Sequence, residues 1–102
     1  MKITGENFKR EVEDNPTLTV IDFYADWCGP CRMLSPIVEE MAARYPDVKF
    51  GKVNVDKEAE LAVRFGIMSI PTLVFIKGGQ VLETSVGYIS EGEFEGKIRS
   101  HE

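Results

Sequence analysis

The chain has 102 residues, of which 43% are hydrophobic and 28% are charged, a balance typical of a globular domain. Seventeen acidic residues against twelve basic ones give a net charge of −5, which argues against nucleic acid or an anionic membrane as a partner. No apolar run approaches the roughly 18 residues of a membrane span, and no signal-peptide core follows Met1. We expect one domain over residues 1–102, a monomer in the cytoplasm.

The first half of the chain predicts a strand–helix–strand unit after a short N-terminal segment. The expected elements are an edge-strand stub at 2–4, a helix capped by Thr4 through about 13, a strand at 18–24, a helix at 28–45 and a strand at 48–55. The strand at 18–24 is apolar on both faces, which is typical of a central strand. A connection of this length implies a right-handed crossover and parallel strands, and Pro36 should kink the helix.

The second half of the chain predicts an antiparallel hairpin followed by a helix. The expected elements are a helix at 58–65 capped by Asp56 and closed by Gly66, a strand at 72–76, a turn at 77–79, a strand at 80–86, and a last helix capped by Ser90 with Glu93. The fold class is therefore α/β. We expect a central mixed sheet, a parallel βαβ half plus an antiparallel ββα half, flanked by helices on both faces.

The pentapeptide Trp27-Cys28-Gly29-Pro30-Cys31 contains both cysteines and the only tryptophan. On a regular helix, residues three apart have Cβ atoms roughly 5–6 Å apart, whereas a disulfide needs roughly 3.5–4.5 Å. The pair should therefore lie in the irregular first turn, where Gly29 lets the backbone bend and Pro30 stiffens it. Free N–H groups and the helix dipole then favour a thiolate on Cys28, which predicts Cys28 as the nucleophile and Cys31 as the resolving thiol.

Two other uses of the cysteine pair compete with redox chemistry. A structural zinc site normally needs four ligands, but the chain has two cysteines and one histidine, His101, next to its end. A purely structural disulfide would close a loop of four residues, which restrains the unfolded chain little. In a reducing compartment a cysteine pair is more often catalytic or metal-binding than structural. Dithiol–disulfide exchange is therefore the favoured interpretation.

Asp22 is the one acidic residue in the apolar strand at 18–24. Buried carboxylates are rare unless they are paired, so Asp22 either faces a polar gap or is buried for chemistry. Lys52 belongs to the neighbouring strand. It is either a solvated edge charge or a partner of Asp22.

Several separated motifs, taken together and in this order, resemble the thioredoxin family over nearly the whole chain. They are Val20-Ile21-Asp22-Phe23 leading into Ala25-Asp26-Trp27-Cys28-Gly29-Pro30-Cys31, Pro36, Lys52-Val53-Asn54-Val55-Asp56, Gly66-Ile67, Ile70-Pro71-Thr72 and Val86-Gly87. The resemblance implies the thioredoxin fold, a cis bond before Pro71 beside the cysteines, and a buried Asp22 below Cys31 that carries the proton. Cys31, buried beside apolar side chains, needs such a base.

The resemblance also implies the activity and partners of a protein disulfide reductase. Such a protein binds no cofactor and receives electrons from NADPH through thioredoxin reductase, a flavin (FAD) enzyme, and it donates them to disulfide-containing target proteins in redox homeostasis. The residues expected to modulate the cysteines are Gly29, Pro30, Lys52 and Pro71. We expect six residues to form an apolar rim for substrate, and core packing is the alternative role for them. They are Trp27, Ile70, Pro71, Val86, Gly87 and Tyr88.

Three features depart from the family pattern. Tyr24 stands where a tryptophan is often found, the pair Met68-Ser69 replaces a charged residue and glycine, and the first strand is clipped. The pair Met68-Ser69 bears on which partner proteins are preferred. A disulfide oxidant or isomerase, and a redox-sensitive binding module, remain as alternative functions.

Overall fold

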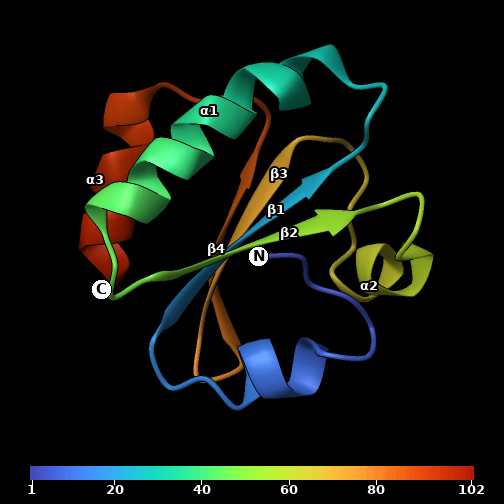
Figure 1. The fold of residues 1–102 in the computed structure, drawn as a ribbon, viewed down its shortest axis with the longest axis horizontal. Helices are drawn as coiled ribbons and strands as arrows, with labels where there is room; N and C mark the ends of the chain where they lie inside the picture. The colour runs from blue at the N-terminus through green and yellow to red at the C-terminus, as the bar shows by residue number, and fades with distance from the viewer.

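A four-stranded sheet runs through the middle of the molecule, with helices on both of its faces (Figure 1). The computed structural model describes all 102 residues. The elements in chain order are η1 (Lys9–Glu13), β1 (Leu18–Tyr24), α1 (Gly29–Arg44), β2 (Lys49–Asn54), α2 (Ala59–Arg64), β3 (Thr72–Lys77), β4 (Gln80–Val86) and α3 (Glu91–His101). None of the helices combines the length and the hydrophobicity that a membrane-spanning segment requires.

The strand order is β2-β1-β3-β4, with one parallel pair and two antiparallel pairs. β1 runs parallel to β2, as expected for strands joined through α1. β3 lies antiparallel to β1 on its other side and pairs with β4 through a hairpin. The predicted mixed sheet, with a parallel half and an antiparallel half, is confirmed.

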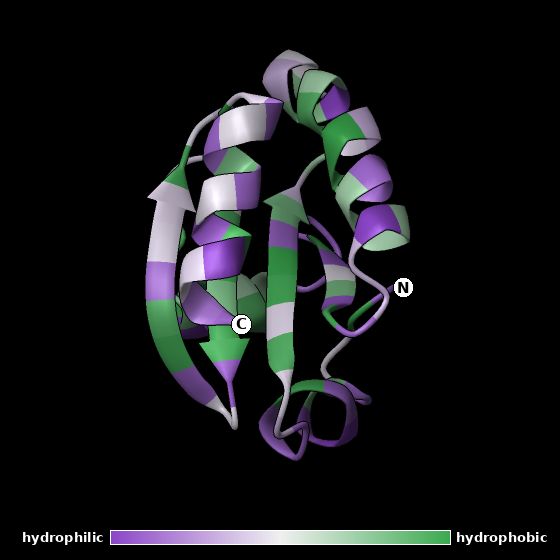
Figure 2. Cartoon of the chain, turned by 90° about the vertical axis from the view of Figure 1, so that its left-hand side faces the viewer, coloured by the Kyte–Doolittle hydropathy of each residue, from purple (hydrophilic) through white to green (hydrophobic).

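The two faces of β1 contribute to two separate hydrophobic cores, because successive strand residues point to opposite faces. Leu18 and Val20 pack under α1 and α3, which lie next to each other in Figure 1. Ile21 and Phe23 pack on the other face, with apolar residues of η1 and α2. Figure 2 shows long hydrophobic bands on the strand at the centre of the view, whereas the edge strand and the helices have mixed colours. Asp22 therefore points toward the α1 face.

Several predicted ends are confirmed by local hydrogen bonds and dihedral angles. The Ser90 hydroxyl accepts the Glu93 N–H at 3.2 Å, and so caps α3. Gly66 has φ +64°, the left-handed conformation that ends α2. The turn between β3 and β4 consists of Gly78 and Gly79, both with positive φ, which suits a tight two-residue hairpin. Lys77, predicted in this turn, belongs instead to β3.

Two predicted helix caps are wrong. Thr4 accepts the Asn7 N–H at 3.3 Å, while the Asn7 side chain accepts the Thr4 N–H at 2.8 Å, so the pair closes a turn. The helix begins only after this turn, and residues 9–13 form one turn of π-helix. Asp56 does not cap α2, whose N-cap residue is Glu58. The Asp56 carboxylate instead accepts the indole N–H of Trp27, at 2.9 Å.

Two glycines with opposite surroundings allow a test of this packing. A Cβ on Gly51 in β2 would lie 2.5 Å from Cγ1 of the fully buried Ile3, whereas a Cβ on Gly96 in α3 would meet nothing within 4 Å. We expect Gly51→Ala to destabilise the protein by about 1–3 kcal/mol through overpacking. Gly96→Ala should stabilise it by about 1 kcal/mol, because alanine favours a helix interior. Urea unfolding midpoints check both values, and an unchanged midpoint for Gly51→Ala would contradict the packing described.

Candidate active site

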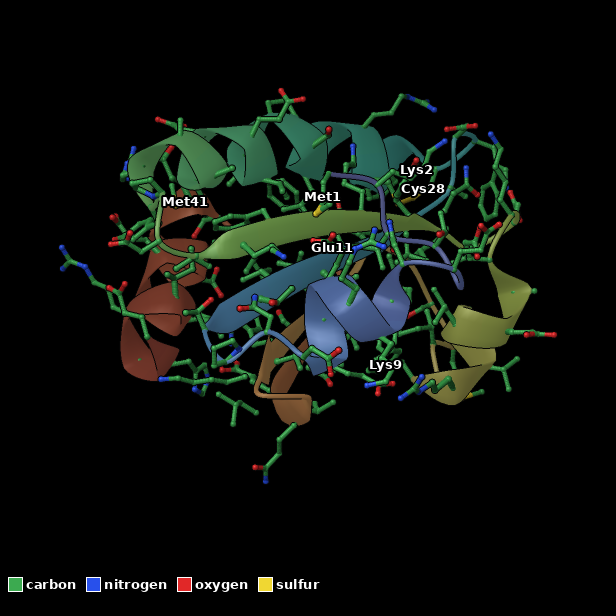
Figure 3. The ribbon with its side chains drawn as sticks, turned by 60° about the horizontal axis from the view of Figure 1, so that its bottom comes forward. Met1, Lys2, Lys9, Glu11, Cys28 and Met41 are labelled. Atoms are coloured by element: carbon green, nitrogen blue, oxygen red, sulfur yellow. A yellow bond between two sulfur atoms is a disulfide. The ribbon has the colours of Figure 1, made fainter.

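Cys28 is the N-cap residue of α1, and Cys31 lies in the first turn of this helix. The Cys28 backbone is extended, with φ −90° and ψ 113°, and Pro30 occupies the start of the helix. The two cysteines are joined by a disulfide, with their Cα atoms 5.2 Å apart. The expected position of the pair, at the cap and inside the first turn, is thus confirmed. Figure 3 shows Cys28 at the end of α1.

The helix start directs an N–H group at the Cys28 sulfur. The Cys31 N–H donates a hydrogen bond of 3.2 Å to Cys28 Sγ. The sulfur thus takes the place that a side-chain oxygen has at other helix N-caps. In the reduced protein the same N–H group faces a thiol or thiolate, together with the positive end of the helix dipole. This arrangement favours the thiolate of Cys28 over that of Cys31.

The loop between β1 and α1 holds this helix start in place. The Cys28 N–H donates to the Ala25 carbonyl at 3.2 Å, which closes a turn directly after the strand. The Arg32 guanidinium, one turn into α1, donates to the Asp26 carbonyl at 2.8 Å. Ala25 and both cysteines form a small buried cluster against Ile70 and Val55. The disulfide is therefore anchored to the end of the central strand.

The segment Ile70-Pro71 lies against the disulfide, as the family resemblance implies. The peptide bond between these residues is cis. The Ile70 carbonyl oxygen lies 3.9 Å from Cys28 Sγ, and the Pro71 carbonyl accepts the Gly87 N–H at 2.8 Å. The structure thus brings Ile70, Pro71 and Gly87, which are far from Cys28 in sequence, to the same end of the sheet.

Asp22 is buried below α1, with only 1% of its surface exposed. Neither oxygen of its carboxyl group has a hydrogen-bond partner. Burial raises the pKa of Asp22 to about 6, while the positive charge of Lys52 opposes this rise. The group can therefore change protonation near neutral pH, which few carboxyl groups can do.

A cavity of about 190 Å³, lined mostly by polar residues, connects Asp22 with Cys31. Both Asp22 and Cys31 are among the residues that line it, the full set being Asp22, Tyr24, Ala25, Asp26, Cys31, Arg32, Ser35 and Lys52. A water molecule occupies about 30 Å³ in the liquid, so this space has room for several. Asp22 and Cys31 therefore border one space that is large enough to hold water.

Lys52 is neither a fully solvated charge nor an ion-pair partner of Asp22. Its Cα is paired with that of Asp22 across the two parallel strands. Its ammonium group donates to the Ser35 hydroxyl at 3.1 Å and lies 4.7 Å from the centroid of the Tyr24 ring. No salt bridge within 4 Å joins it to Asp22.

The predicted rim residues differ in their accessibility. Trp27 and Val86 are 69% and 65% exposed, and Tyr88 is also exposed, so these side chains are available for contact. Ile70 and Gly87 are half-buried, and Pro71 is buried. The exposed side chains are available for the expected contact role, whereas Pro71 is buried.

An apolar groove of about 410 Å³ beside Trp27 was not predicted from the sequence. Its lining residues come from four separate segments and are Trp27, Val55, Ala62, Ile67, Met68, Ser69 and Ile70. Met68 is 96% exposed, although it is a large apolar residue. Val86 and Tyr88 do not line this groove. Trp27 and Ile70 had been predicted as rim residues, and the pair Met68-Ser69 had been singled out as a departure from the family pattern. The other lining residues had not been assigned to a contact surface.

The comparisons with known proteins agree with this geometry. The sequence model of the Thioredoxin family matches residues 1–100. The chain is 41% identical to "Thioredoxin 1" of Nostoc sp. over 98% of its length and 94% of that protein. It is 43% identical to "Thioredoxin" of Alicyclobacillus acidocaldarius, over 96% and 93% of the two chains, and 39% identical to "Thioredoxin" of Bacillus subtilis, over 99% and 96%. With its cysteine disulfide at the head of α1, the chain belongs to the thioredoxin family of disulfide oxidoreductases.

Proposed function

We propose that this protein reduces disulfides in other proteins, with Cys28 as nucleophile and Cys31 as resolving thiol. The single observation that carries the assignment is the N–H of Cys31 directed at Cys28 Sγ over 3.2 Å. This hydrogen bond and the helix terminus stabilise a negative charge on Cys28, whereas Cys31 lies inside the first turn of α1.

The proposed reaction has two exchange steps. The Cys28 thiolate attacks one sulfur of the target disulfide, a mixed disulfide forms, and the other target sulfur leaves as a thiolate. Cys31 then loses its proton and attacks Cys28 Sγ, which forms the Cys28–Cys31 disulfide and releases the second target thiolate. Two electrons pass from the dithiol to the target, so the target is reduced and this protein is oxidised.

Asp22 is the proposed proton acceptor for Cys31. Both residues line the same polar cavity, and the raised pKa of Asp22 brings its proton exchange close to neutral pH. In its ionised form Asp22 accepts the Cys31 proton directly or through water, and it returns the proton to solvent through the cavity. Lys52 modulates this exchange through its positive charge.

Target proteins are proposed to dock across the exposed apolar side chains next to Cys28. Trp27, Val86 and Tyr88 present exposed apolar surface, and the apolar groove lies on the Trp27 side. The Ile70 carbonyl lies beside Cys28 Sγ, and Gly87, between Val86 and Tyr88 in sequence, is bonded to the Pro71 carbonyl. An extended target segment can approach Cys28 along these backbone groups.

The reducing direction follows from the two residues between the cysteines. Stabilising a thiolate stabilises the reduced form and makes the disulfide a stronger oxidant. Gly29 and Pro30 bring neither charge nor side-chain donor, so only the helix terminus favours the thiolate, and an ionised Asp22 opposes it. The dithiol should therefore be comparatively reducing, as suits the proposed cytoplasmic location.

We expect Pro30→His to shift the protein toward oxidant behaviour. A cationic imidazole beside Cys28 stabilises the thiolate, which should change the equilibrium constant with glutathione by about tenfold or more. The control is Pro30→Gln, which removes proline without adding charge. Equal equilibrium constants with glutathione for the Pro30→His and Pro30→Gln variants would show that charge next to Cys28 does not decide whether the protein acts as a reductant or an oxidant.

Turnover with a reductase tests the proposed function. In the presence of NADPH and a flavin-containing thioredoxin reductase, the protein should consume NADPH continuously while a protein disulfide is reduced. The matched control is Cys28→Ser, which should consume none. A protein that binds its targets but sustains no NADPH consumption would instead be a binding module.

A further inference from the structure

The placement of the Lys52 ammonium group is unexpected for a lysine beside a buried acid. Asp22 and Lys52 occupy paired positions on adjacent parallel strands, where side chains point to the same face. The Asp22 carboxyl has no hydrogen-bond partner, and such a group normally attracts any cation within reach. The cation next to it is nevertheless bonded elsewhere.

Ser35 is the residue that binds this cation. It lies in α1 four residues after Cys31, and so on the same helix face, above the cavity that contains Asp22. Its hydroxyl oxygen accepts from the Lys52 ammonium at 3.1 Å, and the Tyr24 ring lies 4.7 Å from the same nitrogen. The ammonium group is therefore held between a helix residue and an aromatic face, at the lining of the cavity.

We propose that Ser35 is a positioning residue for the resolution step, whose hydroxyl, together with the Tyr24 ring, holds the Lys52 ammonium off the Asp22 carboxylate. The inference deepens the proposed function, because it rests on Asp22 as the proton acceptor for Cys31. A carboxylate in close contact with an ammonium holds a proton poorly and is a weak base. Kept apart from the ammonium, the buried carboxylate remains basic enough to take the Cys31 proton.

Four other ionisable residues line the cavity with Asp22 and Lys52. From α1 come Cys31 and Arg32, from the loop Asp26, and from β1 itself Tyr24, all lining the cavity. Arg32 donates to the Asp26 carbonyl at 2.8 Å and is thereby engaged away from Asp22. On β3, the residue paired with Asp22 is Leu73, which carries no charge. Lys52 is thus the cation that acts on Asp22, and the Ser35 hydroxyl is its hydrogen-bond partner.

The test is Ser35→Ala, with the titration of the Asp22 carboxyl carbon followed by NMR. Alanine favours the helix, so the variant should fold. Without the hydroxyl, the ammonium moves to the Asp22 carboxylate, and an opposite charge at close range lowers a carboxyl pKa by about one unit or more. The titration midpoint should move toward acid by about one unit. Resolution of a mixed disulfide near pH 7 should slow, because Asp22 becomes a weaker base.

Two further variants separate this role from a merely structural one. Ser35→Thr keeps a hydroxyl at this position, so the titration midpoint of Asp22 should equal that of the parent. In a Lys52→Met background, Ser35→Ala should no longer move the midpoint, because the ammonium is absent. An unchanged or more alkaline midpoint in Ser35→Ala, or the same acid shift without Lys52, would overturn the proposal.

The experiment also distinguishes this inference from the role of Asp22 itself. The NMR titration reports where the ammonium lies even if Asp22 carries no proton in the reaction. The proton-acceptor role is instead tested by Asp22→Asn, whose resolution rate should be lower than that of the parent.

Discussion

Replacing Cys28 with serine should abolish disulfide reduction, whereas replacing Cys31 with serine should leave a protein that becomes trapped on its target. Without Cys28 no thiolate at the helix N-terminus can attack the target disulfide. Without Cys31 the first exchange still occurs, but no second thiol is present to break the mixed disulfide. The rate of target reduction should fall to that of the uncatalysed exchange in both variants.

Mass spectrometry of the trapped species checks the assignment. The Cys31→Ser variant, incubated with a target disulfide, should carry the target covalently on Cys28. The Cys28→Ser variant is the matched control, and it should remain largely unmodified, because the helix N-terminus that favours a thiolate faces position 28 and not Cys31. Accumulation of the adduct on Cys31 in the control, and not on Cys28, would reverse the two roles.

Replacing Asp22 with asparagine should stabilise the fold at neutral and alkaline pH. The pKa of this buried carboxyl rises from 3.8 to about 6 on folding. The folded state therefore binds the proton more tightly than the unfolded chain, and its stability falls as the pH rises from the lower value through the higher one. The penalty above pH 6 is roughly 3 kcal/mol, and asparagine, which has no charge, avoids it.

The pH dependence of this difference is the measurement. Urea unfolding should show Asp22→Asn more stable than the parent by roughly 2–3 kcal/mol at pH 8, and by little at pH 4. Asp47→Asn, which removes an exposed carboxylate of the same charge, is the control. A stability difference of the same size at both pH values would mean that ionisation of Asp22 is not its source.

The strands and helix caps that were predicted correctly depend on local sequence. The continuous apolar run of β1 defined both of its ends, since both faces of a central strand are buried. Gly78 and Gly79 allowed the hairpin turn, and Ser90 capped α3 through a residue three positions away. The cysteine pair was placed at the helix start because disulfide geometry excludes a regular helix interior.

The features that were missed depend on residues distant in sequence. Asp56 is of a residue type that often caps helices, but its hydrogen-bond partner is the indole of Trp27, 29 residues earlier. Ser35 looks like an ordinary residue of a helix interior, and its importance depends on Lys52 approaching from β2. The groove beside Trp27 brings together side chains from several segments. Periodicity identifies the buried face of each element, but it does not identify which side chains of two elements meet.

The equilibrium of the Cys28–Cys31 pair with glutathione is the most direct test of the central claim, that this protein gives electrons to other disulfides. The emission of Trp27, next to Cys28 and the only tryptophan, reports the redox state, and thiol labelling checks it. In a glutathione buffer poised at about −200 mV, we expect most of the protein to be the disulfide, because a reducing dithiol passes its electrons to oxidised glutathione. Mostly dithiol in the same buffer would identify an oxidant and contradict the account.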